Sequence, residues 1–279
     1  MNKYILTFAC FFTILIAACK KDNLQTNPEQ EQPTLERFSA AYLSLGLDTA
    51  KICRVVLPST EKLSDTTTTR DKLWKGKTTI TVSFLGGSST LQTKVMSYAT
   101  QWSETTGIKF QTTTGTGDIR VSFDGDSGSW SYIGTDAIKV NANQPTMNYG
   151  WLTEQSSDAE ISKIVLHEFG HALGLIHEHQ RPNSEVNWNT SAVYIYYEGY
   201  PNYWTKEQVD AYVISPNGSS QLIYNADDSS TIMNFPISNA LSSTSISTKN
   251  TITLSEGDKG LISFVYPTLT GIKKLNFRK

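Results

Sequence analysis

The sequence predicts a single α+β domain, and three observations support this fold class. The run from Thr78 to Leu85 alternates in the manner of a β-strand. Residues 89–105 and 157–173 carry apolar side chains at helical spacing. Behind a polar N-terminal region, about 200 residues remain, which is enough for one domain with a real hydrophobic core.

Further elements follow the same patterns along the chain. We expect short strands at 108–111, 118–123 and 137–140. The sequence Ser-Glu-Gly-Asp at 255–258 is typical of a helix start, and it predicts a last helix that ends near Val265. The chain contains no internal repeat, so a single domain is the simplest organisation.

All four histidines of the chain lie in one short stretch, H-E-F-G-H-A-L-G-L-I-H-E-H. His167, His171 and His177 fit the spacing H-E-x-x-H-x-x-G-x-x-H. Neutral imidazole is a common zinc ligand, and three imidazoles plus a water form a catalytic site with an open position. A chain with so few histidines has no other place for such a site.

The spacing has a physical reason. Residues i and i+4 of a helix lie on the same face, so His167 and His171 can point at one ion. Glu168 is one position further on, close enough to take a proton from a zinc-activated water without binding the metal. Gly174 tolerates a left-handed conformation and so can end the helix and return His177 to the metal.

The fourth histidine, His179, leaves an alternative open. It could replace His177 as the third ligand, but the motif spacing favours His177. We expect His179 to be a surface residue or one that packs behind a ligand.

The extended histidine motif and a later methionine-containing turn resemble the metzincin zinc endopeptidases. The chain is most similar to their astacin-like branch, and the similarity extends roughly from Leu73 to Pro267. The segments that carry the resemblance are His167–His177, the Glu178 and Gln180-Arg181 continuation, Asp118–Phe123, Thr146–Asn148, and the turn Ser230–Met233.

The resemblance implies a metzincin-type zinc-dependent protease domain. Its fold would be a twisted mixed sheet with an active-site helix and a smaller, irregular C-terminal part that ends in a helix. One catalytic Zn²⁺ would be bound by His167, His171 and His177, with Glu168 as the catalytic base and Met233 as a structural residue below the metal. The strand at 118–123 would offer its edge to a peptide or protein substrate, which a zinc-activated water would hydrolyse as in an endopeptidase.

One departure from the family pattern motivates an alternative. Astacin-like enzymes usually carry a tyrosine two residues after the methionine, and this chain has Phe235 there, which lacks a hydroxyl. Tyr224 could supply one, although a buried structural role explains it more simply. The alternative is a lipid-anchored, zinc-containing binding protein with lost or weak catalysis; the intact Glu168 favours the enzyme.

The N-terminus predicts export and lipid attachment. Residues 1–18 have the charged start and short apolar run of a signal peptide, and the run is too short to span a membrane. Leu15-Ile16-Ala17-Ala18-Cys19 resembles a bacterial lipobox, which would place a lipid on Cys19. We therefore expect a lipid-anchored protein of the cell envelope, at the outer membrane or cell surface; the alternative is simple secretion.

The domain boundaries follow from composition. Residues 19–34 form a polar tether, residues 35–71 an N-terminal extension or short pro-segment, and residues 72–270 the zinc metallopeptidase domain. A formal net charge of −2 gives no basic surface for nucleic acid, and we expect a monomer.

Of the three cysteines, only Cys53 would remain free in the mature chain, so no intrachain disulfide is expected. Cys53 could bind the zinc as a latency switch, but a small buried or linker thiol is the preferred interpretation. The aromatic residues that follow the histidine motif, such as Tyr196, Tyr197 and Trp204, could line a cleft, although packing in a core explains them better.

Overall fold

The computed structural model describes residues 53–56, 69–125, 128–181, 184, 186–199, 203–215, 228–234, 237, 239–243 and 251–268. All of them lie in the larger of the two units into which the chain divides, Leu35–Lys279. The predicted signal peptide, the tether with Cys19, and the residues Tyr224 and Phe235 lie outside the described part of the chain.

A mixed sheet forms one layer of the described domain. Its strand order is β1-β5-β6-β4-β2-β3, and every neighbouring pair is parallel except the antiparallel pair β5 and β6. The strands are β1 Cys53–Val56, β2 Thr79–Phe84, β3 Lys109–Thr112, β4 Ile119–Ser122, β5 Ser129–Tyr132 and β6 Met147–Tyr149.

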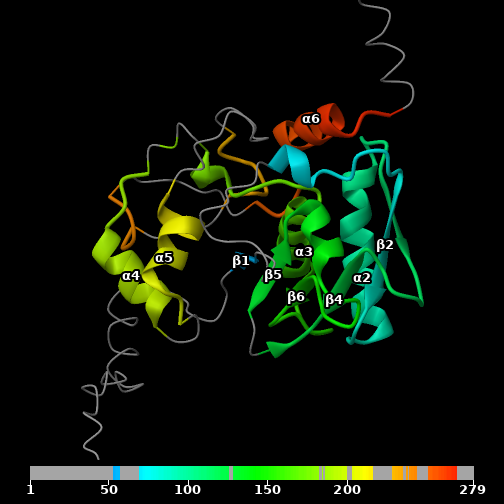
Figure 1. Cartoon of the computed structure of the whole chain (residues 1–279), viewed down its shortest axis with the longest axis horizontal. Helices are drawn as coiled ribbons and strands as arrows, with labels where there is room; N and C mark the ends of the chain where they lie inside the picture. The colour runs from blue at the N-terminus through cyan, green and yellow to red at the C-terminus, as the bar shows by residue number, and fades with distance from the viewer. Residues whose placement is uncertain are drawn as a thin grey trace, which may run out of the picture. The chain divides into compact units, whose positions relative to one another are not determined.

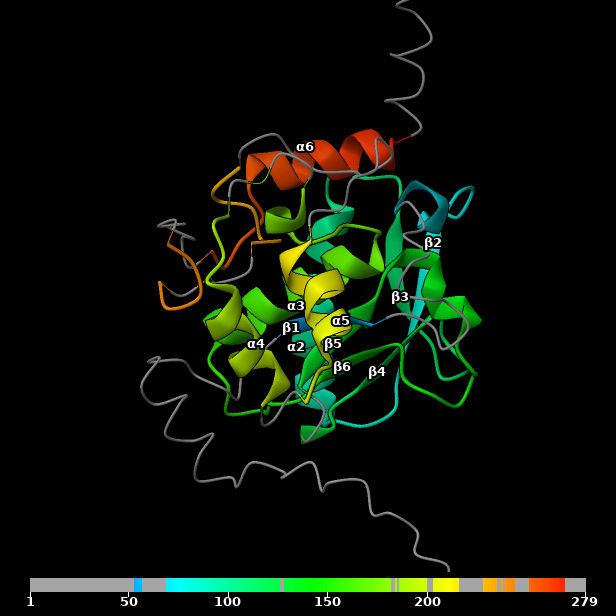
Figure 2. The same cartoon turned by 60° about the vertical axis from the view of Figure 1, so that its left-hand side comes forward.

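Helices form the second layer and the C-terminal part. Helices α2 and α3 pack against each other, and α6 lies over one end of this pair in both views (Figures 1 and 2). The helices are α2 Ser89–Ala99, α3 Asp158–Ala172, α4 Thr190–Glu198, α5 Lys206–Val209 and α6 Glu256–Val265. Shorter helical turns are η1 Thr69–Lys72, η2 Thr100–Ser103, η4 Gly134–Lys139, η5 Glu178–Gln180 and the π-helical η6 Asp210–Ile214. No helix in the described ranges is long and apolar enough to span a bilayer.

The helix starts follow from local capping. The Ser88 side chain accepts a hydrogen bond from the Leu91 N–H at the start of α2, and the Ser157 side chain caps α3 in the same way. The helix expected at 157–173 is confirmed, and the one expected at 89–105 consists of α2 followed by η2.

The apolar residues form two main cores. The larger one joins the sheet to α2, α3 and α6, and includes Val82, Trp102 and Phe169. The second joins α4, α5 and η6 and is rich in aromatic residues, among them Tyr197 and Trp204, whose rings stack 5.1 Å apart. The expected packing role of these aromatic residues is therefore confirmed, whereas Tyr203 is exposed.

Two expectations about strands are wrong. Residues 137–140 do not form a strand, because η4 covers most of this range and Arg120 donates hydrogen bonds to the Ala137 and Val140 carbonyls. The strand expected at 118–123 exists as β4, but it lies between β2 and β6. Its hydrogen-bonding groups are therefore used inside the sheet and cannot pair with a substrate.

Candidate metal centre

Helix α3 brings three of the predicted site residues together. His167, Glu168 and His171 lie on its last two turns and are all buried. The helix ends in a turn at Gly174, whose φ of +99° suits glycine, and the Leu175 N–H donates to the Gly170 carbonyl. The helix end predicted at Gly174 is thus confirmed.

The turn after α3 returns the chain to the helix. His177 lies with its Nε2 atom 3.1 Å from Nε2 of His171 and 3.2 Å from Nε2 of His167. The structure therefore brings together the three histidines of the motif, with one ring nitrogen of each directed at a common point.

The outer ring nitrogens show which tautomers are present. The Nδ1 atom of His167 lies 2.8 Å from the Ile232 carbonyl, and Nδ1 of His171 lies 2.9 Å from the Leu175 carbonyl. A carbonyl oxygen only accepts, so both Nδ1 atoms carry the proton and both Nε2 atoms present a lone pair. Burial lowers the pKa of His167 to about 4 and the pKa values of His171 and His177 well below their usual range, so all three rings are neutral at pH 7.

Three neutral imidazole nitrogens gathered this closely fit a metal site. The thiol sulfur of Cys53 completes the group, 3.9 Å from Nε2 of His171 and 3.8 Å from Nε2 of His177. Tetrahedral zinc with its usual bond lengths would place two nitrogens about 3.3 Å apart and a sulfur about 3.6 Å from a nitrogen. The four observed distances agree with those for zinc to within a few tenths of an ångström, and all four ligand atoms lie within 4.8 Å of one another.

The position of Cys53 differs from the preferred expectation of a small buried or linker thiol. Strand β1 pairs in parallel with β5, in the register Cys53 with Ser129 and Val56 with Tyr132. It lies between β5 and the pair α4 and α5, and Cys53 packs against their core (Figure 1). The alternative of a metal-capping cysteine is the one that the geometry favours.

His179 is not a surface residue. It is buried, and its ring lies nearly parallel to that of His177 with centroids 5.2 Å apart. Trp188 packs edge-on against the His179 ring, with centroids 5.7 Å apart. Burial, with a smaller contribution from His167, lowers the pKa of His179 to about 3. Of the two expected positions, the one behind a ligand is correct.

The methionine-containing turn supports the histidines through its main chain. The Ile232 carbonyl accepts from His167, and the next carbonyl, that of Met233, accepts from the Glu178 N–H. The Met233 side chain is buried beside Gly170, where an added Cβ would lie 2.3 Å from its sulfur. Two consecutive carbonyls of the turn therefore position His167 and the segment that carries His177. Sequence patterns alone did not indicate this role of the turn.

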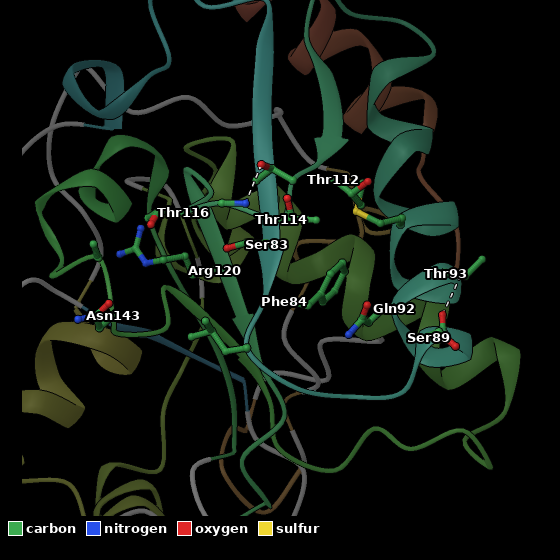
Figure 3. A pocket seen from close by; sticks show the side chains of 15 residues that line it. Ser83, Phe84, Ser89, Gln92, Thr93, Thr112, Thr114, Thr116, Arg120 and Asn143 are labelled. Atoms are coloured by element: carbon green, nitrogen blue, oxygen red, sulfur yellow. Dashed lines mark hydrogen bonds between the residues drawn. The ribbon is translucent and has the colours of Figure 1, made fainter.

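A separate hollow lies between α2, the end of β2 and the loop that follows β3 (Figure 3). Threonine and serine side chains dominate its lining, including Thr112, Thr114 and Thr116. None of the histidines lines this hollow, so it is distinct from the metal centre.

The geometry gathers three neutral imidazoles around a point that suits a cation, and the buried carboxylate of Glu168 follows the first of them in sequence. That combination of groups, on a mixed sheet beside one long helix, is typical of the active site of a zinc-dependent peptidase. The family model described as Astacin, a peptidase family, matches residues 66–266. The chain therefore belongs to the astacin family and is a zinc metalloendopeptidase.

Solved structures of myroilysin agree with this assignment. One is 43% identical over 72% of this chain and 98% of its own, with a TM-score of 0.67. A second crystal structure of myroilysin is 42% identical over 78% of this chain and 91% of its own, with a TM-score of 0.62. High choriolytic enzyme 1, a hatching enzyme zinc-protease from the medaka fish Oryzias latipes, is 16% identical over 71% of this chain and 96% of its own, with a TM-score of 0.48.

Proposed function

We propose that this chain hydrolyses peptide bonds in peptide or protein substrates, and that it does so with one Zn²⁺ held by His167, His171 and His177. The observation that supports this most is the convergence of three Nε2 atoms. Those of His167 and His171 present a lone pair, because their Nδ1–H groups bond to carbonyls. Neutral nitrogen ligands fit zinc. The Met233 side chain packs beside Gly170 and has a structural role.

When bound, the zinc supplies Lewis-acid polarisation of the scissile carbonyl and lowers the pKa of water. The Glu168 carboxylate accepts the proton of the attacking water and then delivers it to the nitrogen of the leaving amine. Glu168 is fully buried and lies on α3 between His167 and His171 in sequence. Burial of the site excludes bulk water, which strengthens each of these interactions.

The substrate would bind along strand β5. In the described sheet, β5 has β6 on one side and β1 on the other. Departure of β1 would leave the main-chain groups of β5 available to an extended peptide, which could then add as a strand. This proposal replaces β4 as the substrate-binding strand.

The pairing of β1 with β5 also supports the proposal that the protein is made as a latent precursor. Cys53 would be the fourth zinc ligand, since a thiolate binds zinc well and a site with four protein ligands has no open position. Strand β1 would at the same time cover the edge of β5. Residues 35–71 would thus act as a pro-segment, and activity would require their removal or displacement.

The lipid anchor and the location in the cell envelope remain part of the proposal. The sequence Leu15-Ile16-Ala17-Ala18-Cys19 supports lipid attachment at Cys19, followed by the polar tether 19–34. Membrane fractionation of the wild type and of Cys19→Ser tests it: we expect the variant to move to the soluble fraction. An unchanged distribution would contradict the anchor and favour simple secretion. We propose a monomer.

Casein cleavage with and without a zinc chelator tests the enzymatic function. The samples are the wild type and Glu168→Ala, each treated with a protease that removes the N-terminal segment. We expect cleavage by the wild type, its loss with chelator, and a loss of at least about 10²–10⁴-fold in Glu168→Ala. Glu154→Ala, at an exposed position before α3, is the matched control and should retain full activity.

The zinc content of each variant separates this function from the alternative of a binding protein. Glu168→Ala should retain one zinc per chain, because its carboxylate moves a proton and binds no metal. Zinc in the wild type without cleavage of casein would favour the binding protein. Equal cleavage by the wild type and Glu168→Ala would contradict the role of Glu168.

A further inference from the structure

The start of helix α6 holds a carboxylate that is aimed at the methionine turn. Asp258 is only 1% exposed. Its Oδ2 atom accepts from the Ile232 N–H and the Ser255 N–H, both at 2.9 Å, and its Oδ1 atom accepts from the Thr231 hydroxyl. Capping of α6 uses only the Ser255 contact. The bonds to residues 231 and 232 therefore do not serve to cap α6.

These bonds form the end of a chain that reaches the metal centre. The Thr231 hydroxyl donates to Asp258 and accepts from the Met233 N–H at 3.1 Å. The carbonyl of that same peptide group, on Ile232, accepts from Nδ1 of His167 at 2.8 Å. In this hydrogen-bond chain, the 232–233 peptide group and the Thr231 hydroxyl each accept a bond from the side of His167 and donate one toward Asp258. The Asp258 carboxylate at the end only accepts.

We infer that Asp258 is a positioning residue for His167, acting through the Thr231 hydroxyl and the peptide group between Ile232 and Met233. This inference rests on the proposed zinc site. A negative charge at the end of an aligned hydrogen-bond chain polarises every bond along it. The Ile232 carbonyl becomes a stronger acceptor, which holds His167 in the tautomer that presents Nε2 and makes that nitrogen a better ligand.

Burial raises the pKa of the Asp258 carboxyl group, and the hydrogen bonds from Thr231, Ile232 and Ser255 oppose that rise. The two main-chain N–H donors require an acceptor at Oδ2, which both a carboxylate and the oxygen of an amide can provide. Asp258→Asn therefore preserves shape and the contacts of Oδ2, while its NH₂ group would face the Thr231 hydroxyl and reverse the direction of that bond. The substitution tests charge and direction separately from packing.

The chain offers a matched control. Asp228 joins the same two segments, because it accepts from the Ser230 N–H at 2.9 Å and from the Ser255 hydroxyl. Asp228→Asn thus removes a neighbouring charge of the same sign at the same junction. A structural weakening of the contact between the turn and α6 would affect both variants alike, whereas the proposed chain passes through Asp258.

The measurement is zinc affinity by competition with a chelator, together with the absorption spectrum of the Co²⁺-substituted protein and unfolding of the metal-free protein. Full-length wild type, Asp258→Asn and Asp228→Asn are compared. We expect Asp258→Asn to bind zinc about tenfold more weakly, with a shifted Co²⁺ spectrum. Asp228→Asn should stay within about twofold of the wild type, since the bonds of its side chain to Ser230 and Ser255 do not lead to His167.

Wild-type affinity and spectrum in Asp258→Asn would overturn the inference, and so would an equal loss in Asp228→Asn. If Asp258→Asn fails to fold, Thr231→Val and Thr231→Ser decide instead, because only serine keeps the hydroxyl. A loss of affinity in Thr231→Val that Thr231→Ser restores supports the chain, and equal affinities overturn it. A wild type that binds no zinc would contradict the proposed function itself.

Discussion

The thiol sulfur of Cys53 lies 3.8 Å from Nε2 of His177, although 124 residues separate them in sequence. The parallel pairing of β1 with β5 is what brings the cysteine to this position. The same strand therefore supplies a fourth ligand atom and occupies the edge of the sheet. In the proposed function, one segment would thus oppose activity in two ways, at the metal and at the substrate strand.

We expect Cys53→Ser to be active without processing. Full-length wild type can act only in the small fraction of molecules whose β1 has detached. The variant lacks the thiolate that would bind the zinc, so this fraction should be larger and peptide cleavage more than about tenfold faster. A thiol-modifying reagent should activate the full-length wild type and leave Cys53→Ser unchanged, which controls for Cys10 and Cys19. Equal rates of the two unprocessed proteins would contradict latency through Cys53.

The two histidines of the 177–179 segment should differ in their effect on zinc content. His177→Ala removes a converging ring nitrogen, and zinc binding of about 10–16 kcal/mol shared among a few ligands should fall by several kcal/mol. His179→Phe keeps a flat ring in the stack on His177 and should retain one zinc per chain. Metal analysis after dialysis checks both. Full zinc in His177→Ala with loss in His179→Phe would reverse the assignment.

The sequence predicts the parts of the site that depend on local geometry. Helical spacing places His167 and His171 on one face, and Gly174 ends the helix whatever surrounds it. The strand that carries Cys53 could not be predicted in this way, because four residues gain their structure only from pairing with β5 far along the chain. Long-range pairing leaves no periodic signal in so short a segment.

A similar limit explains the remaining differences. The apolar character of residues 137–140 suggests a strand, but the buried Arg120 guanidinium takes the carbonyls that a strand would need. The Ser255–Asp258 pattern predicts a helix start correctly, yet it cannot show that Asp258 also bonds to Thr231 and Ile232. When one side chain has both a local and a long-range role, the sequence pattern predicts only the local role.

The metal-free protein should lose stability on acidification. Burial lowers the pKa of His167 to about 4 and that of His179 to about 3, while an unfolded histidine titrates near 6.5. Below about pH 6.5 the unfolded chain therefore binds protons that the folded chain does not. Each group contributes its full stability above that pH and loses about 1.4 kcal/mol per pH unit as the pH falls toward its folded pKa.

Denaturant unfolding of the chelated protein between pH 7 and pH 5 measures this slope. His179→Phe removes one of the titrating groups, so its slope should be shallower than that of the wild type, with a difference that approaches about 1.4 kcal/mol per pH unit toward pH 5. Parallel profiles for the two proteins would show that His179 is not held neutral by burial.

Gly170→Ala and Gly260→Ala should change stability in opposite directions, although both replace a glycine inside a helix. Alanine is the better helix former by about 1 kcal/mol, and at Gly260 no atom lies within 4 Å of an added Cβ. That variant should be more stable by up to this amount. At Gly170 the Cβ would lie 2.3 Å from the Met233 sulfur and 3.3 Å from Cζ2 of Trp102. Overpacking in a buried site typically costs about 1–3 kcal/mol, so this variant should be less stable.

Met233 is the group that must move, and the turn that carries it also holds His167 through the Ile232 carbonyl. Gly170→Ala should therefore weaken zinc binding as well as the fold, while Gly260→Ala should leave zinc affinity unchanged. A double-mutant cycle with Met233→Ala tests the cause. Met233→Ala alone leaves a cavity and should cost about 2–5 kcal/mol, and the pair should cost less than the sum by about 0.5–3 kcal/mol. Additive losses would show that the methionine is not what excludes a larger residue from position 170.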